Sequence, residues 1–285
     1  MATEDEDGGP PGCHVELAPA KINLTLHVTG QRSDGYHLLD SLVTFADFGD
    51  RVSVAKADSP VLHVSGPMAQ AVPLGADNLV LRAADLMGVA LAIRLEKHLP
   101  AAAGIGGGSS DAAAVLRAAA VLRPDLALPA DAGLSLGADL PVCLLARAAR
   151  MTGIGDGVSR INGMPPVHAV LVNPGVAVST AAIFRQLARK DNPPMPKDLP
   201  RWDTAADLIT WLGGQRNDMQ PAAIKEAPVI AEVISRIGQT DHCGLARMSG
   251  SGATCFGLYP DAASATQAAK ALARPGWWVR AVRLG

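Results

Sequence analysis

Residues 100–111 read Pro-Ala-Ala-Ala-Gly-Ile-Gly-Gly-Gly-Ser-Ser-Asp, and an Ala/Leu-rich run follows them and ends before Pro124. Alanine and leucine are strong helix formers, so this run predicts a helix, which the proline ends. Serine and aspartate favour helix starts, and we expect Ser109 or Ser110 as the N-cap with Asp111 in the first turn. The stretch therefore predicts a glycine-rich loop that opens into a helix.

The glycines make this loop a candidate phosphate site. A helix N-terminus carries unpaired N–H groups and about half a positive charge, and glycines let the backbone wrap closely around an anion. Four of the five positions from Gly104 to Gly108 are glycine. A lone Gly-x-Gly would be read as a flexible turn that only caps a helix, but this density of glycine before two serines favours phosphate. The chain has no Gly-Lys pair, which excludes an ordinary P-loop.

Two other enzyme motifs fit poorly. A dinucleotide-binding fingerprint needs Gly-x-Gly-x-x-Gly, and Ser109 occupies its last position here. The segment Gly133-Leu-Ser-Leu-Gly137 matches the Gly-x-Ser-x-Gly elbow of serine hydrolases, with His168 and His242 available to complete a triad. The elbow requires a strand that leads sharply into a helix, whereas the residues before Gly133 resemble a helix start. We interpret this match as accidental.

Length and composition predict two globular domains. The chain has 285 residues, of which 48% are hydrophobic and 18% charged, which is enough apolar material for two cores. Its 25 basic and 27 acidic residues give a net charge of -2, so there is no broad basic surface for a nucleic acid. No apolar run approaches the ~20 residues of a membrane span. We expect a cytoplasmic protein with neither a nucleic-acid nor a membrane partner.

The chain can be divided by composition. Residues 1–12 are acidic and rich in glycine and proline, unlike a signal peptide, and predict a disordered tail. A Gly/Pro-rich stretch over 151–166 predicts a linker, so we expect domains at 13–157 and 158–285. The proline-rich residues 190–201 predict a mobile surface connection. The four cysteines are far apart without a Cys-x-x-Cys, which predicts reduced and mostly buried thiols.

Apolar and polar residues alternate from Ile22 to Val28, which predicts a half-buried strand. Lys21, Asn23 and Thr25 would share its polar face. Similar patterns predict further strands over 42–45, 51–54, 91–95, 167–172 and 254–258, and a helix over 78–87.

Five motifs in order resemble those of the diphosphocytidyl-methylerythritol kinases, a family in the galactokinase, homoserine, mevalonate and phosphomevalonate (GHMP) kinase superfamily. They are Pro19-Ala-Lys21-Ile-Asn23-Leu, Gln31-Arg-Ser-Asp-Gly35-Tyr36-His37, residues 100–114, Gly137-Ala-Asp139-Leu-Pro141 and Met248-Ser-Gly-Ser-Gly252-Ala-Thr. The resemblance implies an α+β fold. Its N-terminal, ATP-binding domain would be similar to domain 2 of ribosomal protein S5, and its C-terminal GHMP kinase domain would be ferredoxin-like.

The resemblance also implies ATP-dependent phosphorylation of the 2-hydroxyl of a diphosphocytidyl-methylerythritol substrate, with Mg²⁺ bridging the ATP phosphates. Lys21 and Asp139 match the family's catalytic pair, although the pattern alone would suit a solvated lysine and a loop-capping aspartate. A carboxylate can accept the hydroxyl proton while a neighbouring ammonium keeps it ionised. The implied ATP site comprises Pro100, Ala101, Ala102, Ala103, Gly104, Ile105, Gly106, Gly107, Gly108, Ser109 and Ser110. The sequence names no protein ligand for the metal and no oligomeric state.

By the same resemblance, Tyr36 and Phe184 would sandwich the cytosine, and His37 and Asn23 would make polar contacts. Phe184 fits equally well in the core of an amphipathic helix over 181–189. The turn over 249–252 would support the phosphate loop, or would simply be a tight turn before a strand.

Two rivals remain open at this point. A homoserine or mevalonate kinase would keep the phosphate loop but should lack Tyr36 and His37 in this turn. A catalytically silent nucleotide-binding or sensing protein would not need Lys21 and Asp139.

Overall fold

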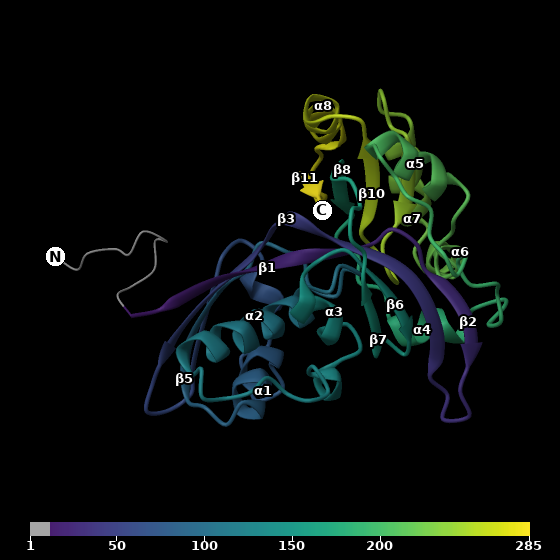
Figure 1. Cartoon of the computed structure of the whole chain (residues 1–285). Coiled ribbons are helices and arrows are strands. Elements are labelled where there is room, and N and C mark those ends of the chain that lie inside the picture. Colours follow the sequence, from purple (N-terminus) through teal and green to yellow (C-terminus); the bar gives the residue numbers. More distant parts are fainter. Residues whose placement is uncertain (1–11) are drawn as a thin grey trace. The chain divides into compact units, whose positions relative to one another are not determined.

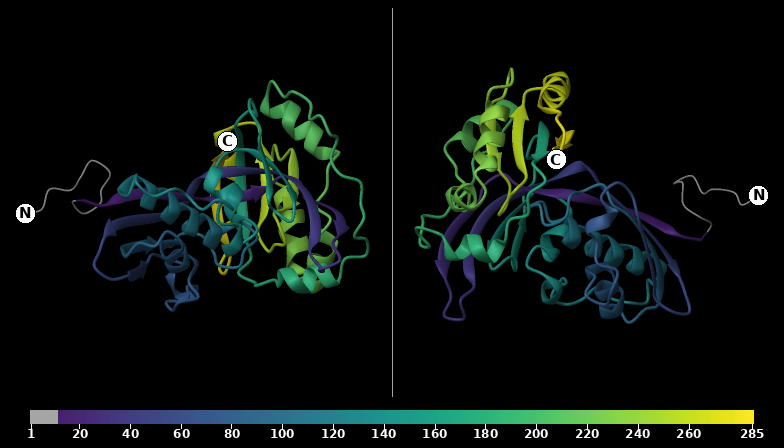
Figure 2. Two further views of the ribbon diagram at one scale, coloured as in Figure 1. Left: turned by 60° about the horizontal axis from the view of Figure 1, so that its bottom comes forward. Right: turned by 180° about the vertical axis from the view of Figure 1, so that it is seen from behind.

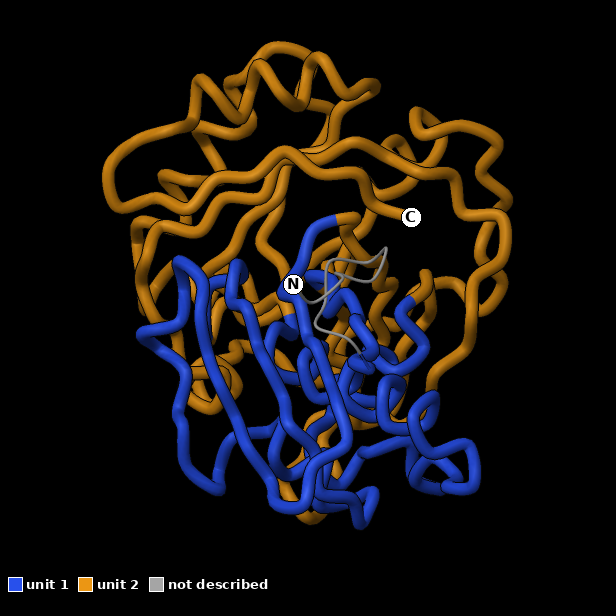
Figure 3. The backbone as a smooth tube through the Cα atoms, turned by 90° about the vertical axis from the view of Figure 1, so that its left-hand side faces the viewer, with its two compact units in different colours: residues 1–20, 48–101, 106–146 blue, residues 21–47, 102–105, 147–285 orange. Residues whose placement is uncertain are grey.

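The structure, a computed structural model, describes residues 12–285 (Figure 1). The predicted tail therefore lies outside the described residues, apart from Gly12. The chain forms two compact units, shown in separate colours in Figure 3. Unit 1 contains the residues up to 20, 48–101 and 106–146, and unit 2 contains 21–47, 102–105 and 147–285. Both units contain helices and strands, which confirms the α+β class. The expected boundary between 157 and 158 stays a prediction.

The elements in chain order are β1 (His14–Asn23), β2 (His27–Gln31), β3 (His37–Lys56), β4 (Val61–Ser65), η1 (Ala69–Ala71), α1 (Leu79–Leu86), β5 (Leu91–Glu96), α2 (Gly107–Leu122), η2 (Leu134–Leu136), α3 (Leu140–Leu145), β6 (Ala149–Gly153), β7 (Gly157–Arg160), β8 (Val167–Asn173), α4 (Thr180–Arg185), α5 (Ala205–Gly213), α6 (Gln220–Glu226), α7 (Val229–Gly238), β9 (Leu245–Met248), β10 (Cys255–Tyr259), α8 (Ala262–Leu272) and β11 (Trp278–Leu284).

Unit 1 packs helices against a small sheet. Strand β5 pairs antiparallel with the second half of β3 and parallel with β4. Its alternate residues Leu91, Ile93 and Leu95 are buried, as the period of a strand requires. They join one apolar cluster with α1 and α2, whose small and aliphatic residues such as Ala112 and Leu116 are fully buried. This core holds the start of α2, and with it one end of the glycine-rich loop.

Unit 2 contains the antiparallel strand order β11-β8-β10-β9. Strands β8, β10 and β11 can be followed side by side in Figures 1 and 2. Helices α7 and α8 pack on this sheet and share one apolar cluster with it, which includes Val170, Val172, Val233 and Leu272. The turn over 249–252 lies between β9 and β10, so this core positions it.

Several local predictions are wrong. The expected linker over 151–166 contains a hairpin of β6 and β7, because Gly153 and Gly155 adopt positive φ angles of 69° and 110° and close a turn. The expected separate strands over 42–45 and 51–54 are parts of the single strand β3. The expected strand from 22 to 28 is interrupted after Asn23, and both of its faces are buried.

The proline-rich segment over 190–201 is anchored rather than loose. The guanidinium of Arg150 donates to the carbonyl oxygens of Met195, Pro196 and Lys197, and it also pairs with Asp40. Asp40 in turn accepts from the backbone N–H of Met195, which is 2% exposed. The prolines explain the irregular backbone of this segment. Its hydrogen bonds to Arg150 and Asp40, and the buried side chain of Met195, hold it to the rest of unit 2.

The four cysteines are free, as predicted, but only half of them are buried: Cys143 and Cys255 are buried, and Cys13 and Cys243 are partly exposed.

Candidate active site

The middle of the glycine-rich loop, residues 102–105, belongs to unit 2, where three of its carbonyl groups are bound in succession. The carbonyl oxygen of Ala103 accepts from Thr254 N–H over 3.1 Å, and that of Gly104 accepts from the Ser249 hydroxyl over 3.0 Å. The carbonyl of Ile105 accepts from Lys21 N–H over 2.9 Å. In a trans peptide the C=O and the next N–H point in opposite directions. The loop amides therefore point away from these three donors, as an anion site needs.

The turn over 249–252 packs backbone to backbone against this part of the loop. A Cβ atom on Gly104 would lie 2.6 Å from the carbonyl oxygen of Ser249 and 2.7 Å from the nitrogen of Gly252. One on Gly250 would lie 2.7 Å from the carbonyl oxygen of Gly104. All three glycines have positive φ, so both space and conformation require glycine. The turn is thus more than a connection between two strands.

The remainder of the loop belongs to unit 1 and leads into α2. The N-cap is Gly106, with a left-handed φ of 64°, so the expected cap at Ser109 or Ser110 is wrong. The two serines lie inside the first turns of the helix. Ser110 donates its hydroxyl to the carbonyl of Pro19 over 2.8 Å, and the Ser109 hydroxyl lies 3.7 Å from where a Cβ of Gly137 would be. Ser109 is therefore next to the segment that carries Asp139.

Lys97, Asp50 and Asp111 form a buried ionic cluster near the start of α2, which the sequence did not predict. The ammonium of Lys97 contacts the carboxylates of Asp50 and Asp111, the latter over 2.6 Å. Asp50 also accepts from the backbone N–H of Leu99 over 2.8 Å. Burial raises the pKa of Asp111 to about 8, against the opposing effect of Lys97, and nearby Asp50 raises it further. The pKa of Lys97 is raised too, because the two carboxylates outweigh its burial.

The two predicted catalytic residues lie in different units, each close to its own part of the loop. Lys21 is 3% exposed near the end of β1 and is tied to the loop by its backbone N–H. Asp139 is half-buried and precedes α3, where its carbonyl accepts from Cys143 N–H over 3.0 Å. Its side chain makes no capping hydrogen bond to this helix. Asp139 therefore does not cap α3 through its side chain, and its catalytic role stays a prediction.

Tyr36, His37 and Phe184 line one open pocket of about 600 Å³ in unit 2. The rings of His37 and Phe184 are stacked, with centroids 4.3 Å apart and planes inclined by 11°. Phe184 also packs against the core, as the amphipathic-helix interpretation expected, while stacking of cytosine on this ring stays a prediction. Tyr36 is 61% exposed. Burial, and then the nearby charge of Lys190, lower the pKa of His37, which favours a neutral imidazole.

Asn23 is the one predicted substrate contact that does not line this pocket. It is buried, donates its side-chain amide to the Ser41 hydroxyl over 2.8 Å, and donates its backbone N–H to Ser249 Oγ over 3.1 Å. Its Oδ1 atom has no hydrogen-bond partner among the described residues. The structure thus places Asn23 with the glycine turn rather than with the aromatic rings.

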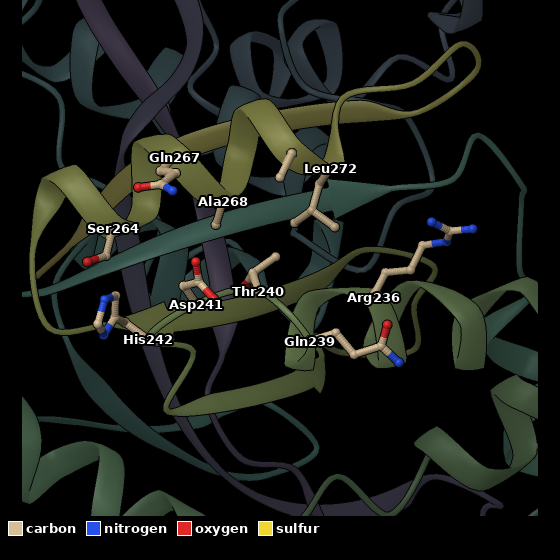
Figure 4. Close-up of a pocket in the computed structure, with 10 residues that line it drawn as sticks. Arg236, Gln239, Thr240, Asp241, His242, Ser264, Gln267, Ala268 and Leu272 are labelled. Carbon is tan, nitrogen blue, oxygen red and sulfur yellow. The ribbon is translucent and has the colours of Figure 1, made fainter.

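The hydrolase match has no support in the structure. Ser135 lies in the short 3₁₀ helix η2, which follows turns rather than a strand, so no nucleophile elbow is formed. His242 lines a separate pocket of about 250 Å³, where side chains of α7, α8 and the α7–β9 connection gather (Figure 4). No predicted site residue of the kinase motifs lines that pocket.

Comparisons with known proteins agree with the motifs. The model of the GHMP kinases N terminal domain matches residues 78–158, and that of the GHMP kinases C terminal domain matches 195–276. A 4-diphosphocytidyl-2-C-methyl-D-erythritol kinase from Dinoroseobacter shibae is 58% identical over 96% of this chain and 96% of its own. The chain belongs to the 4-diphosphocytidyl-2-C-methyl-D-erythritol kinase family.

Another relative and two solved structures are also similar to this chain. The relative, a 4-diphosphocytidyl-2-C-methyl-D-erythritol kinase from Cereibacter sphaeroides, is 55% identical over 94% of this chain and 98% of its own. A crystal structure of a 4-(cytidine 5'-diphospho)-2C-methyl-D-erythritol kinase, 35% identical, superposes with a TM-score of 0.80 over 95% of this chain and 99% of that chain. A homoserine kinase from Cytophaga hutchinsonii, at 17% identity and a TM-score of 0.64 over 95% of each chain, shares the fold.

Two further features concern residues 12–285 as a whole. No helix there combines the length and apolar character that crossing a membrane requires. No group of three or more His, Cys, Asp or Glu side chains there is arranged to hold a metal ion.

Proposed function

We propose that this protein transfers the γ-phosphoryl group of ATP to the 2-hydroxyl of 4-diphosphocytidyl-2-C-methyl-D-erythritol. This reaction would serve the non-mevalonate pathway to isopentenyl diphosphate and isoprenoids. The observation that carries the proposal is the 58% identity to a kinase of that name over 96% of both chains. We further propose a cytoplasmic enzyme that has no nucleic-acid partner.

Asp139 is the proposed base and Lys21 the proposed charge partner. In phosphoryl transfer the protein mainly positions the reactants and stabilises charge, and a carboxylate accepts the proton of the attacking hydroxyl. Lys21 adjoins the loop at Ile105 through its backbone, and Asp139 follows Gly137, which lies near Ser109. Each residue is thus close to its own part of the proposed ATP site.

The proposed ATP site is the loop from Pro100 to Ser110. Its bound carbonyls turn backbone N–H groups toward the opposite side, and the start of α2 adds the positive end of a helix dipole. These groups suit the phosphates of ATP. A Cβ atom on Gly104 would clash with the turn over 249–252, so the space at this position suits glycine.

We also propose that ATP binds together with Mg²⁺. A magnesium ion usually keeps several waters and takes only one or two protein carboxylates besides substrate phosphates, so a three-residue cluster is not required. The Ser109 hydroxyl at the start of α2 provides an oxygen donor of the preferred kind. When bound, the ion would neutralise charge on the phosphates.

The pocket lined by Tyr36, His37 and Phe184 is the proposed site for cytosine. It offers aromatic surface for stacking, and the cations Arg185 and Lys190 line the same pocket and suit a diphosphate. Homoserine and mevalonate have no base to stack, so this pocket favours the diphosphocytidyl acceptor over the acceptors of related kinases.

The direct test is ADP release in the presence of Mg²⁺ and ATP with four conditions: the diphosphocytidyl acceptor, homoserine, mevalonate and no acceptor. We expect release with the diphosphocytidyl acceptor alone. Release with another acceptor instead would overturn the proposed substrate, and ATP binding without acceptor-dependent release would favour a non-catalytic nucleotide-binding protein.

A further inference from the structure

Asn217 is a buried residue that none of the motifs includes. It is 6% exposed and lies in a short irregular segment before α6. This segment is bound to the backbone of Leu26: Leu26 N–H donates to the Arg216 carbonyl over 2.9 Å, and Asp218 N–H donates to the Leu26 carbonyl over 2.8 Å. Asn217 is therefore held firmly beside the stretch that carries Lys21 and Asn23.

The side chain of Asn217 binds the glycine turn on both sides of Ser249. Its Nδ2 donates to the carbonyl oxygens of Met248 and Gly250, each over 2.9 Å. Its Oδ1 accepts from Met219 N–H over 2.9 Å, which fixes the orientation of the amide. An amide is needed here because only a neutral group with two N–H donors and one acceptor satisfies all three partners.

Ser249 transmits this geometry to the phosphate loop. Its backbone N–H donates to the Thr254 carbonyl over 2.9 Å, and its carbonyl accepts from Gly252 N–H over 3.0 Å. With the backbone held in this way, Ser249 Oγ donates to the Gly104 carbonyl over 3.0 Å and accepts from Asn23 N–H over 3.1 Å. The direction of the Gly104 carbonyl determines the direction of the Ile105 amide, because both belong to one peptide plane.

We propose that Asn217 is a positioning residue for ATP: it holds the carbonyls of Met248 and Gly250 so that Ser249 turns the loop amides toward the phosphates. The inference rests on the proposed function only in taking the loop over 100–110 as the nucleotide site. Asn217 acts through Ser249 and through the loop, and does not itself contact the nucleotide.

The variant Asn217→Asp tests this directly. It keeps the size of the side chain and an acceptor for Met219 N–H, but it loses both donors and places a carboxylate against two carbonyl oxygens. We expect the dissociation constant for adenylyl imidodiphosphate with Mg²⁺, measured by calorimetry without acceptor, to rise about tenfold or more. In turnover assays the KM for ATP should rise and kcat should fall, while the KM of the diphosphocytidyl acceptor changes little.

Asn192→Asp is the matched control. Its Nδ2 also donates to two backbone carbonyls, those of Val28 and Arg189, but in the proline-rich segment of unit 2. We expect this variant to bind the ATP analogue as the wild type does. If Asn217→Asp does not fold, Asn217→Ser, which lacks the amide but adds no charge, gives the same comparison.

A double-mutant cycle separates positioning from a general loss of stability. Because Asn217 acts through Ser249, the pair Asn217→Asp and Ser249→Ala should weaken analogue binding no more than the stronger single change. Full additivity of the two effects, or wild-type binding by Asn217→Asp, would overturn the proposal. A wild type that binds the analogue but does not phosphorylate the diphosphocytidyl acceptor would overturn the proposed function alone, since the Asn217 comparison is made on binding.

Discussion

The imidazole of His37 lies flat against the ring of Phe184, with centroids 4.3 Å apart and planes inclined by 11°. Phe184 also packs against the apolar cluster of unit 2, which includes Ile183 and Leu187. The orientation of the ring is therefore set by protein contacts, and a base that stacks here pays less ordering entropy than it would on a loose side chain.

Phe184→Leu keeps an apolar side chain in the core but removes the aromatic face. Stacking contributes about 1 to 3 kcal/mol per base, so we expect the KM of the diphosphocytidyl acceptor to rise about fivefold to a hundredfold with kcat little changed. Steady-state kinetics at saturating ATP measures this. Leu187→Ala is the control, because it removes core contacts without altering the pocket lining. An unchanged acceptor KM in Phe184→Leu would leave Phe184 with a core role only.

Asp139→Asn should lower turnover by orders of magnitude and spare ATP affinity, because the amide cannot accept the hydroxyl proton but keeps the size of the side chain. Single-turnover rates and ATP-analogue binding measure the two quantities separately. Asp131→Asn is a suitable control: Asp131 is an aspartate of the same unit that accepts from the backbone N–H groups of Gly133 and Ser135. Turnover near the wild-type level in Asp139→Asn would remove Asp139 from the role of base.

Gly104→Ala should weaken ATP binding strongly. Its Cβ would lie 2.6 Å from the Ser249 carbonyl oxygen at a backbone φ of 72°, so the loop and the turn must separate. Gly163→Ala is a close control, because Gly163 has a φ of 76° in the same unit but has nothing within 4 Å of its Cβ position. Both variants suffer the same conformational strain, and only the first disturbs the loop. Equal ATP affinity in the two variants would contradict the proposed close packing.

Features that depend only on neighbouring residues could be predicted from the sequence. The glycine-rich loop and a helix ending before Pro124 follow from neighbouring residues, and α2 does end at Leu122. The helix start was misplaced because the left-handed conformation of Gly106 makes it the N-cap, and two serines further on gave a stronger signal. A serine-based rule could not have detected this backbone conformation.

Interactions between distant residues were not predicted. Lys97 meets Asp50 47 positions away, and Asn217 meets Met248 and Gly250 over 31 and 33 positions. Nothing in the pattern around an isolated lysine or asparagine identifies such partners, because they are brought together by the sheet pairings and core of each unit. The predicted roles of Lys21 and Asp139 came from the family resemblance and stay predictions.

Asp111→Asn should change the pH dependence of stability. Lys97 contacts two carboxylates with one positive charge, and ionisation of both would leave a net negative charge in the core of unit 1, which favours the protonated form of Asp111. Its pKa is raised from 3.8 to about 8, chiefly by burial. The unfolded chain releases this proton near pH 4 and the folded chain near pH 8. The stabilising contribution is therefore complete below pH 4 and is lost progressively as the pH rises to about 8.

Asparagine has no such proton, so the difference in unfolding free energy between wild type and Asp111→Asn should fall with pH between about 5 and 8, by up to about 1.4 kcal/mol per unit. Urea unfolding at several pH values measures it. Asp125→Asn serves as the control, because Asp125 is exposed and Arg123 lowers its pKa through a side-chain hydrogen bond, which gives no loss of stability over this range. Parallel pH profiles for wild type and Asp111→Asn would mean that Asp111 is ionised in the folded protein, and that Lys97 balances two carboxylates at once.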